Sequence, residues 1–223
     1  MHKNIDYNSF FTKVFLWMFL GLIITFATAL FFSTFAIDLF IQLLNAPYAF
    51  FGIILLQLGL VFIITLLFNK LSAPILGFIF LLYSFITGIT FTAIFLVFEL
   101  ESIIFIFGLT SFLFGLLAII GYTTKADLSK IGVILLVALI GVIISSIINI
   151  FLQNSLFDII ISAVTVIIFL GLVAFDIQKL KRICESGANE ESKNKIAIRG
   201  ALSLYLDFIN LFISLLKLFG RRK

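Results

Sequence analysis

Histidine and cysteine are almost absent from this chain of 223 residues, which has one copy of each, His2 and Cys184. A single cysteine forms no internal disulfide and no Cys-x-x-Cys metal pair. A single histidine close to the N-terminus nearly excludes His-based metal centres and Ser-His or Cys-His catalytic dyads. We therefore expect a protein that is not an enzyme and that carries no resident cofactor.

Charge is also scarce, because only 12% of the residues are charged while 63% are hydrophobic and the mean hydropathy is +1.30. A soluble domain of this length needs more polar surface, so lipid must surround most of the chain. The apolar runs lack the alternating polarity of a membrane β-barrel. The sequence thus predicts an all-α, polytopic integral membrane protein. The net charge of +4 comes from Lys and Arg between the apolar runs, which argues against a nucleic-acid partner.

The apolar runs predict seven transmembrane helices in a single transmembrane domain, residues 1–223. Each run is close to the length of about 20 residues that a membrane-spanning helix needs. Both prolines, Pro47 and Pro74, fall at run boundaries, as helix breakers should. The predicted spans cover approximately residues 14–35, 49–68, 75–98, 102–122, 131–152, 156–177 and 201–219.

The distribution of Lys and Arg predicts the orientation of the chain. Eleven of them lie in the N-terminus and in the second, fourth and sixth loops, whereas the first, third and fifth loops have none. The positive-inside rule therefore places the N-terminus and the polar stretch Lys179–Arg199 in the cytoplasm. Seven complete spans would put the basic tail outside. Either the last span crosses fully against the rule or it is re-entrant, and we favour full crossing because the run is long enough.

Polar residues form a stripe along each of the last two predicted helices. The spacing of three and four residues places the members of each set on one helix face, which we expect to turn toward the other helix and away from lipid. The last helix carries Ser203, Asp207, Asn210, Ser214 and Lys217, and the one before it carries Ser155, Asp158, Ser162, Thr165 and, farther along, Asp176.

Asp176 and Asp207 are the main candidate functional residues, because intramembrane carboxylates are costly and usually functional. Two facing carboxylates would share a proton, which makes a pH-sensitive latch. When ionised, the pair would offer hard oxygen ligands that suit a transient Ca²⁺ ion. Two plainer interpretations stay open. Asp176 could be an exposed juxtamembrane carboxylate paired with Lys179, and Asp207 could hydrogen-bond structurally or lie on a surface helix.

Three segments resemble motifs of the Bax inhibitor-1 family, also called the transmembrane Bax inhibitor motif family. Residues 121–129 (GYTTKADLS) resemble its GYTTKxDLS signature, residues 169–178 its F-x-G-x-x-x-(Y/F)-D-x-Q motif, and residues 201–212 its A-x-x-L-Y-L-D-F-I-N-L-F motif. The resemblance extends over most of the chain from about Phe11. Gln57 departs from it, since many relatives have a glutamate at that position.

The resemblance implies six helices around a central C-terminal helix, and a pH-dependent calcium leak with Asp176 and Asp207 as the proton-sensing latch. Gln57, Ser162, Thr165, Ser203 and Asn210 are expected as pore or network residues. Expected partners are the lipid bilayer, Ca²⁺ as the transported ion, and protons. The alternative is a non-conducting regulator that binds other membrane proteins, such as a membrane protease. An intramembrane hydrolase is the weakest reading. We expect the protein in a bacterial cell (inner) membrane.

Overall fold

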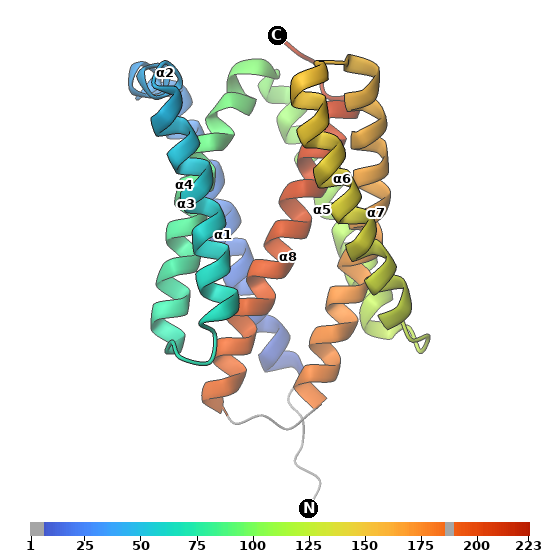
Figure 1. Cartoon of the computed structure of the whole chain (residues 1–223). Helices are drawn as coiled ribbons and strands as arrows, with labels where there is room; N and C mark the ends of the chain where they lie inside the picture. The colour runs from blue at the N-terminus through green and yellow to red at the C-terminus, as the bar shows by residue number, and fades with distance from the viewer. Residues whose placement is uncertain (1–6, 186–189) are drawn as a thin grey trace, which may run out of the picture. The chain divides into compact units, whose positions relative to one another are not determined.

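The structure, a computed structural model, describes residues 7–185 and 190–223, and all the regular elements among these residues are α-helices (Figure 1). His2 and Lys3 therefore lie outside the described residues, as do residues 186–189 in the middle of the predicted polar loop. The helices are α1 (Tyr7–Thr34), α2 (Ile37–Leu44), α3 (Pro47–Leu66), α4 (Ala73–Val97), α5 (Leu100–Thr123), α6 (Ser129–Leu152), α7 (Ser155–Glu185) and α8 (Glu190–Phe219).

Each predicted span corresponds to one helix. Among the described residues, six helices are long and apolar enough to cross a membrane: α1, α4, α5, α6, α7 and α8. The remaining predicted span is α3, which has 20 residues and contains the shorter apolar segment Phe51–Leu66. The chain is thus an all-helical integral membrane protein, as the composition predicts.

The polar stretch Lys179–Arg199 was predicted to be a loop, but most of it is helical. α7 continues to Glu185 and α8 already begins at Glu190, so most of the charged residues lie on helices. Lys, Arg and Glu are good helix formers, and a helix does not end because it leaves the hydrocarbon layer. Hydropathy marks only where the apolar part of a helix ends.

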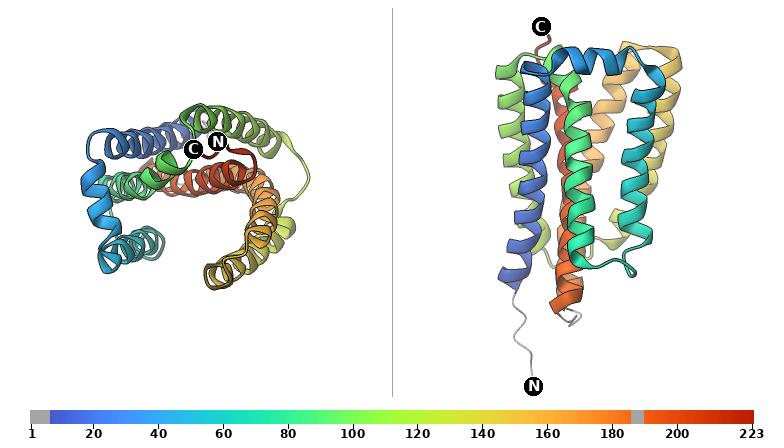
Figure 2. Two further views of the ribbon diagram at one scale, coloured as in Figure 1. Left: turned by 90° about the horizontal axis from the view of Figure 1, so that it is seen from above. Right: turned by 90° about the vertical axis from the view of Figure 1, so that its left-hand side faces the viewer.

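The short helix α2 was not predicted, because its eight residues were too few to form a span. Figure 2 shows α2 lying across the ends of α1 and α3, which it joins. Phe40 is its one fully buried anchor, while Leu39 and Ile41 remain exposed. This pattern is typical of a helix that lies along an apolar surface.

The described chain divides into two compact units, and α8 contributes to both. Unit 1 contains residues up to Phe98, the first part of α8 up to Tyr205, and Lys223, while unit 2 contains Glu99–Ser186 and Leu206–Arg222. The single domain inferred from the sequence stays a prediction.

In unit 1, α1 packs along α4, and Tyr205 of α8 joins them. The Tyr205 hydroxyl lies 2.6 Å from Thr25 Oγ1, which itself donates to the Ser84 carbonyl at 2.9 Å. Because Thr25 has a single hydroxyl proton, Tyr205 is the donor of the first bond. The Tyr205 ring also makes edge contacts with Phe80 and Tyr83 of α4. These contacts surround the Tyr205 side chain, which is fully buried.

In unit 2, α7 packs against both α5 and α6, and the second part of α8 packs against α5 (Figure 1). Phe208 and Phe212 of α8 make edge contacts with Phe107, and Phe208 also touches Phe114. α8 is the most buried of the six candidate spans, at 61%, whereas α6 is the most exposed. This agrees with the inner position predicted for the C-terminal helix.

The C-terminal tail lies beside the connection between α4 and α5. The Arg221 carbonyl accepts a hydrogen bond from the Glu99 amide, and the Arg221 amide donates to Ser102 Oγ. The Lys223 amide donates to the Val97 carbonyl. These bonds place the tail at the opposite end of α8 from its beginning at Glu190. The full crossing of the last span stays a prediction.

Candidate functional site: the aspartates of α7 and α8

Asp176 of α7 and Asp207 of α8 are both buried and both belong to unit 2. Asp176 is 9% exposed and Asp207 is 5% exposed. Asp176 and Lys179 are the charged side chains that act electrostatically on Asp207. The two carboxyl groups are therefore close enough to interact, as the two stripes predict. Their burial disagrees with the plainer interpretations of an exposed juxtamembrane carboxylate and of a surface helix.

One oxygen of Asp207 is left without a hydrogen bond. Asp207 Oδ2 is fully buried and has no hydrogen-bond partner among the described residues. A buried carboxylate oxygen without a partner is costly, so this atom is suited to hold a proton or to receive a cation. Asp176, in contrast, does have interaction partners.

The polar stripes of α7 and α8 face each other at their other end too. Lys217 Nζ of α8 lies 2.8 Å from Asp158 Oδ1 of α7, and the pair forms an ion pair. This contact confirms that the two predicted stripes lie on facing surfaces of an antiparallel helix pair. It joins the two helices at the end away from Asp176 and Asp207.

The hydroxyl and amide groups of the stripes bond mainly to their own helices. Ser162 and Thr165 donate to the carbonyls of Asp158 and Ile161, and Asn210 donates to the Leu206 carbonyl. The hydroxyl protons of Ser162 and Thr165 and one amide proton of Asn210 are thus engaged within their own helices. Ser162 and Thr165 are buried, so their hydroxyl oxygens lie inside the protein.

The remaining two candidates, Gln57 and Ser203, belong to unit 1. Gln57 of α3 donates to Thr87 Oγ1 and Thr90 Oγ1 of α4, each at 3.3 Å. The amide therefore links α3 to α4, as expected for a network residue. Ser203 is half-buried in the first part of α8 and has interaction partners of its own.

The aspartate pair is not a closed metal cage. Within the described residues, no group of three or more His, Cys, Asp or Glu side chains could hold a metal ion together. Ca²⁺ takes six to eight oxygen ligands. Two carboxylates alone are fewer ligands than a resident Ca²⁺ ion takes.

The face of α7 opposite Asp176 packs tightly against two glycines. A Cβ atom on Gly121 of α5 would lie 2.9 Å from the Ala174 carbonyl carbon, and one on Gly132 of α6 would lie 2.5 Å from the Phe175 ring. A side chain at Gly171 would meet Leu135 of α6. Gly121 lets α5 approach the backbone of α7, while Gly132 and Gly171 leave room for side chains between α6 and α7, next to the turn that carries Asp176.

A polar network continues the same face of α7 toward its end. The buried Gln178 side chain accepts a bond from the Leu128 amide at 2.9 Å and donates to the Ala126 carbonyl at 2.7 Å. Arg182 donates to Gln178 Oε1, to Ser129 Oγ and to Asp127 Oδ1. The loop between α5 and α6 is therefore attached to α7.

Asp127 is the titratable group of this network that is strongly perturbed. The Ser129 amide, which donates to Asp127 at 2.9 Å, and the Arg182 guanidinium, at 2.6 Å, hold the pKa of this carboxyl well below its ordinary value. Both side chains of the ion pair are substantially exposed to solvent. The carboxylate thus stays charged at every pH near neutral.

Comparison with known proteins places this geometry in a family. The family described as "Inhibitor of apoptosis-promoting Bax1" matches residues 7–223. The chain belongs to this Bax inhibitor family. The Escherichia coli K12 inner membrane protein YbhL is 39% identical over 218 residues, which cover 97% of this chain and 93% of YbhL.

Two further relatives of this Bax inhibitor family member are uncharacterized proteins. One, from Borreliella burgdorferi, is 40% identical over 217 residues, which cover 97% of this chain and 93% of the relative. The other, from Deinococcus radiodurans, is 34% identical over 222 residues, which cover 99% and 94%. In both cases the similarity extends over nearly the whole chain.

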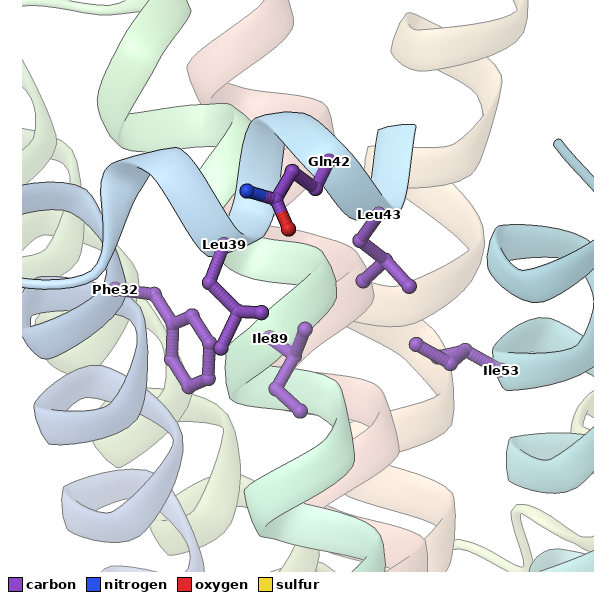
Figure 3. A pocket seen from close by; sticks show the side chains of 6 residues that line it. All are labelled: Phe32, Leu39, Gln42, Leu43, Ile53 and Ile89. Carbon is purple, nitrogen blue, oxygen red and sulfur yellow. The ribbon is translucent and has the colours of Figure 1, made fainter. Parts of the chain in front are cut away.

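A small pocket in unit 1 of the Bax inhibitor family chain is separate from the predicted site residues. Figure 3 shows that it lies below α2 and is lined by Phe32, Leu39, Gln42, Leu43, Ile53 and Ile89. All of these residues except Gln42 are apolar. No predicted site residue lines it, and Gln42 is its one polar side chain.

Sequence reasoning missed the roles of Gln178, Arg182 and Asp127 in this Bax inhibitor family chain. The two motifs that contain Gln178 and Asp127 had been recognised, but not their contact. The sequence feature that indicates this contact is the spacing of four residues from Gln178 to Arg182. This spacing puts the amide acceptor and the guanidinium on one helix face, where they can form a hydrogen bond.

Proposed function

We propose that this protein is a passive, pH-sensitive Ca²⁺ leak, closed by the aspartate pair of α7 and α8. The observation that carries the proposal is the burial of Asp176 and Asp207 within electrostatic reach of each other on facing polar stripes. Intramembrane carboxylates that face a neighbouring helix, and not lipid, are characteristic of ion and proton pathways. Membership of the Bax inhibitor family supports the same reading through the resemblance of its motifs.

The proposed latch follows from the electrostatics of two close carboxyl groups. Such groups titrate as a pair, and their protons leave in two separate steps. With one proton between them, the pair can share a hydrogen bond and hold α7 to α8. When the second proton leaves, two like charges face each other in a poorly hydrated site and repel. Opening should therefore increase as the pH rises.

Calcium competes with the proton for the same oxygens. A divalent cation screens the repulsion between two carboxylates and coordinates hard oxygen ligands. Asp207 Oδ2, which has no hydrogen-bond partner among the described residues, is the atom most ready to accept the ion. Ser162, Thr165 and Asn210 contribute neutral oxygens along the stripes. The contact must remain weak, because an ion that binds tightly does not leave.

We further propose that the N-terminus and the connection between α7 and α8 face the cytoplasm of a bacterial inner membrane. The bias of Lys and Arg supports this orientation, and the relative YbhL is described as an inner membrane protein. Labelling of single cysteines at exposed Lys125 and Phe219 in a Cys184→Ser background tests it. Preferential labelling of position 125 from outside intact cells would show that the orientation is the opposite of the one proposed.

A regulator that binds other membrane proteins is the second candidate, and the exposure of α6 favours it. Only 6% of the apolar window of α6 is buried inside the chain, and a Cβ atom on its Gly141 would meet nothing within 4 Å. Exposed small residues allow the close approach of another transmembrane helix. Such a protein needs no ion pathway of its own.

Calcium flux into proteoliposomes that contain only the purified protein separates these functions. We expect protein-dependent Ca²⁺ entry that is larger at pH 8 than at pH 5, compared with empty liposomes. A pure regulator moves no ions alone, so the absence of flux at both pH values would reject the leak and favour the regulator. An intramembrane hydrolase would instead cleave a peptide in the same preparation, and we propose that this protein is not an enzyme.

A further inference from the structure

The motif of residues 121–129 has no role in the proposed leak, yet several of its residues contact α7. Gly121 of this motif approaches Ala174, Leu128 and Ala126 bond to Gln178, and the motif's acidic residue, Asp127, bonds to Arg182. All these contacts fall within two turns of Asp176. The motif therefore meets α7 at the turn that carries half of the aspartate pair.

The contacts lie on the side of α7 that faces away from Asp176. Residues two positions apart on an α-helix point about 200° apart, so Gln178 and Ala174 are both opposite Asp176. The contact residues form one face: Gly171, Ala174, Phe175, Gln178 and Arg182. The stripe that faces α8, from Asp158 to Asp176, forms the other.

We infer that Gln178 is a positioning residue, which clamps α7 to the α5–α6 loop and thereby fixes Asp176 against Asp207. This inference deepens the proposed function. Its predicted effect on Ca²⁺ flux rests on the proposed function, whereas the positioning of Asp176 does not. Gln178 carries more of the clamp than the Asp127–Arg182 ion pair does. Its side chain is buried and closes two bonds to the loop backbone, whereas exposed ion pairs contribute little.

The clamp gives a physical role to Gly121 of the motif and to the shape of the loop between α5 and α6. Gly121 brings α5 up to the backbone of α7, Gly132 brings α6 up to the Phe175 ring, and the loop between α5 and α6 lies within reach of Gln178. A carboxylate on a helix that is free to rotate would lose its partner, since a rotation of about 30° moves a side-chain end that lies about 5–6 Å from the helix axis by about 3 Å. Holding the back of α7 fixes the direction of Asp176.

Substitution of Gln178 tests the clamp, with readouts that separate it from the leak. Gln178→Leu keeps the approximate size of the side chain and removes both bonds to the loop backbone and the bond from Arg182, while Gln178→Glu keeps the acceptor and loses the donor to Ala126. Gln42→Leu is the matched control, because Gln42 is exposed on α2 in unit 1. The first readout is the carboxyl carbon resonance of Asp176 in ¹³C-aspartate protein in lipid, assigned by its loss in Asp176→Asn.

We expect Gln178→Leu to shift and broaden the Asp176 resonance while the Asp38 resonance stays in place. Gln178→Glu should give an intermediate position, and Gln42→Leu should match the parent. Ca²⁺ flux at pH 5, where the latch is closed, should rise roughly three- to tenfold in Gln178→Leu, the change expected for one or two lost hydrogen bonds.

The outcomes are distinct. If the Asp176 resonance of Gln178→Leu and Gln178→Glu coincides with that of the parent, the clamp is overturned whatever the flux. If the resonance shifts but the parent conducts no Ca²⁺, the clamp stands and the leak is rejected. If Gln178→Leu does not fold, the resonance of Gln178→Glu decides. A shift of the Asp38 resonance as large as that of Asp176 would show a general loss of structure and would also reject the specific role.

Discussion

Lys217 of α8 reaches across to Asp158 of α7 and forms an ion pair at 2.8 Å, at the far end of the helix pair from the two buried aspartates. α7 and α8 are thus joined by opposite charges at one end and bring two buried carboxyl groups together farther along. The two ends differ in environment as well. Asp158 and Lys217 are 33% and 41% exposed, whereas Asp176 and Asp207 are buried.

The first prediction concerns this ion pair. Because both side chains are partly exposed, the pair should contribute no more than about 1 kcal/mol to stability. Asp158→Asn and Lys217→Met should each lower the melting temperature only slightly. The double variant should cost no more than one single variant, since both changes remove the same interaction. Thermal unfolding in detergent measures this, and a single-variant loss above about 2 kcal/mol would show a stronger, desolvated pair.

The second prediction concerns the contact of α5 with α7. Gly121→Ala places a methyl group against the Ala174 backbone, which has no freedom to move aside as a side chain would. We expect a loss of about 1–3 kcal/mol, as for overpacking in a core. Gly115→Ala is the matched control on the same helix, because a methyl group there meets nothing within 4 Å. Since alanine favours helix over glycine, the control should be neutral or up to about 1 kcal/mol more stable.

If Gly121→Ala has the same melting temperature as the parent, the backbones of α5 and α7 must be farther apart than they are in this structure. The result would also weaken the proposed clamp, because Gly121 brings the loop to Gln178.

The third prediction concerns the pH dependence of the loop between α5 and α6. The pKa of Asp127 is lowered in the folded protein, chiefly by the Ser129 amide and then by Arg182. A lowered pKa means that the stabilisation is complete above the ordinary Asp value, near 3.9, and is lost only as the pH falls through the lower folded value. The bond from the Ser129 amide should therefore persist throughout the range from about pH 5 to 8 in which a latch would act.

Amide hydrogen exchange at Ser129 measures this persistence. After correction for the intrinsic rate, protection should be constant between pH 5 and 8 in the parent, and reduced in Asp127→Ala. Lys125→Ala is the control for removal of a charge from the same loop. Protection that falls between pH 8 and pH 5 would show that Asp127 titrates in this range and that the network itself senses pH.

The sequence was sufficient to predict the spans and the facing stripes, because both follow from periodicities that lipid enforces. The 3- and 4-residue spacing of Asp158, Ser162 and Thr165 anticipated the face that meets Lys217. The extension of α7 beyond Lys179 escaped prediction because hydropathy reports the lipid boundary, not the helix end. The contacts of Gln178 escaped it because they join residues about 50 positions apart through the backbone of a loop, which no local pattern records.

The central claim is that the Asp176–Asp207 pair sets the pH dependence of a calcium leak. The most direct measurement is Ca²⁺ flux into proteoliposomes between about pH 5 and 8 for the parent, Asp176→Asn and Asp207→Asn. Either substitution removes the like-charge repulsion, so we expect flux that rises with pH in the parent and is nearly independent of pH in both variants. Identical pH profiles in all three proteins would contradict the latch, even if the protein conducts calcium.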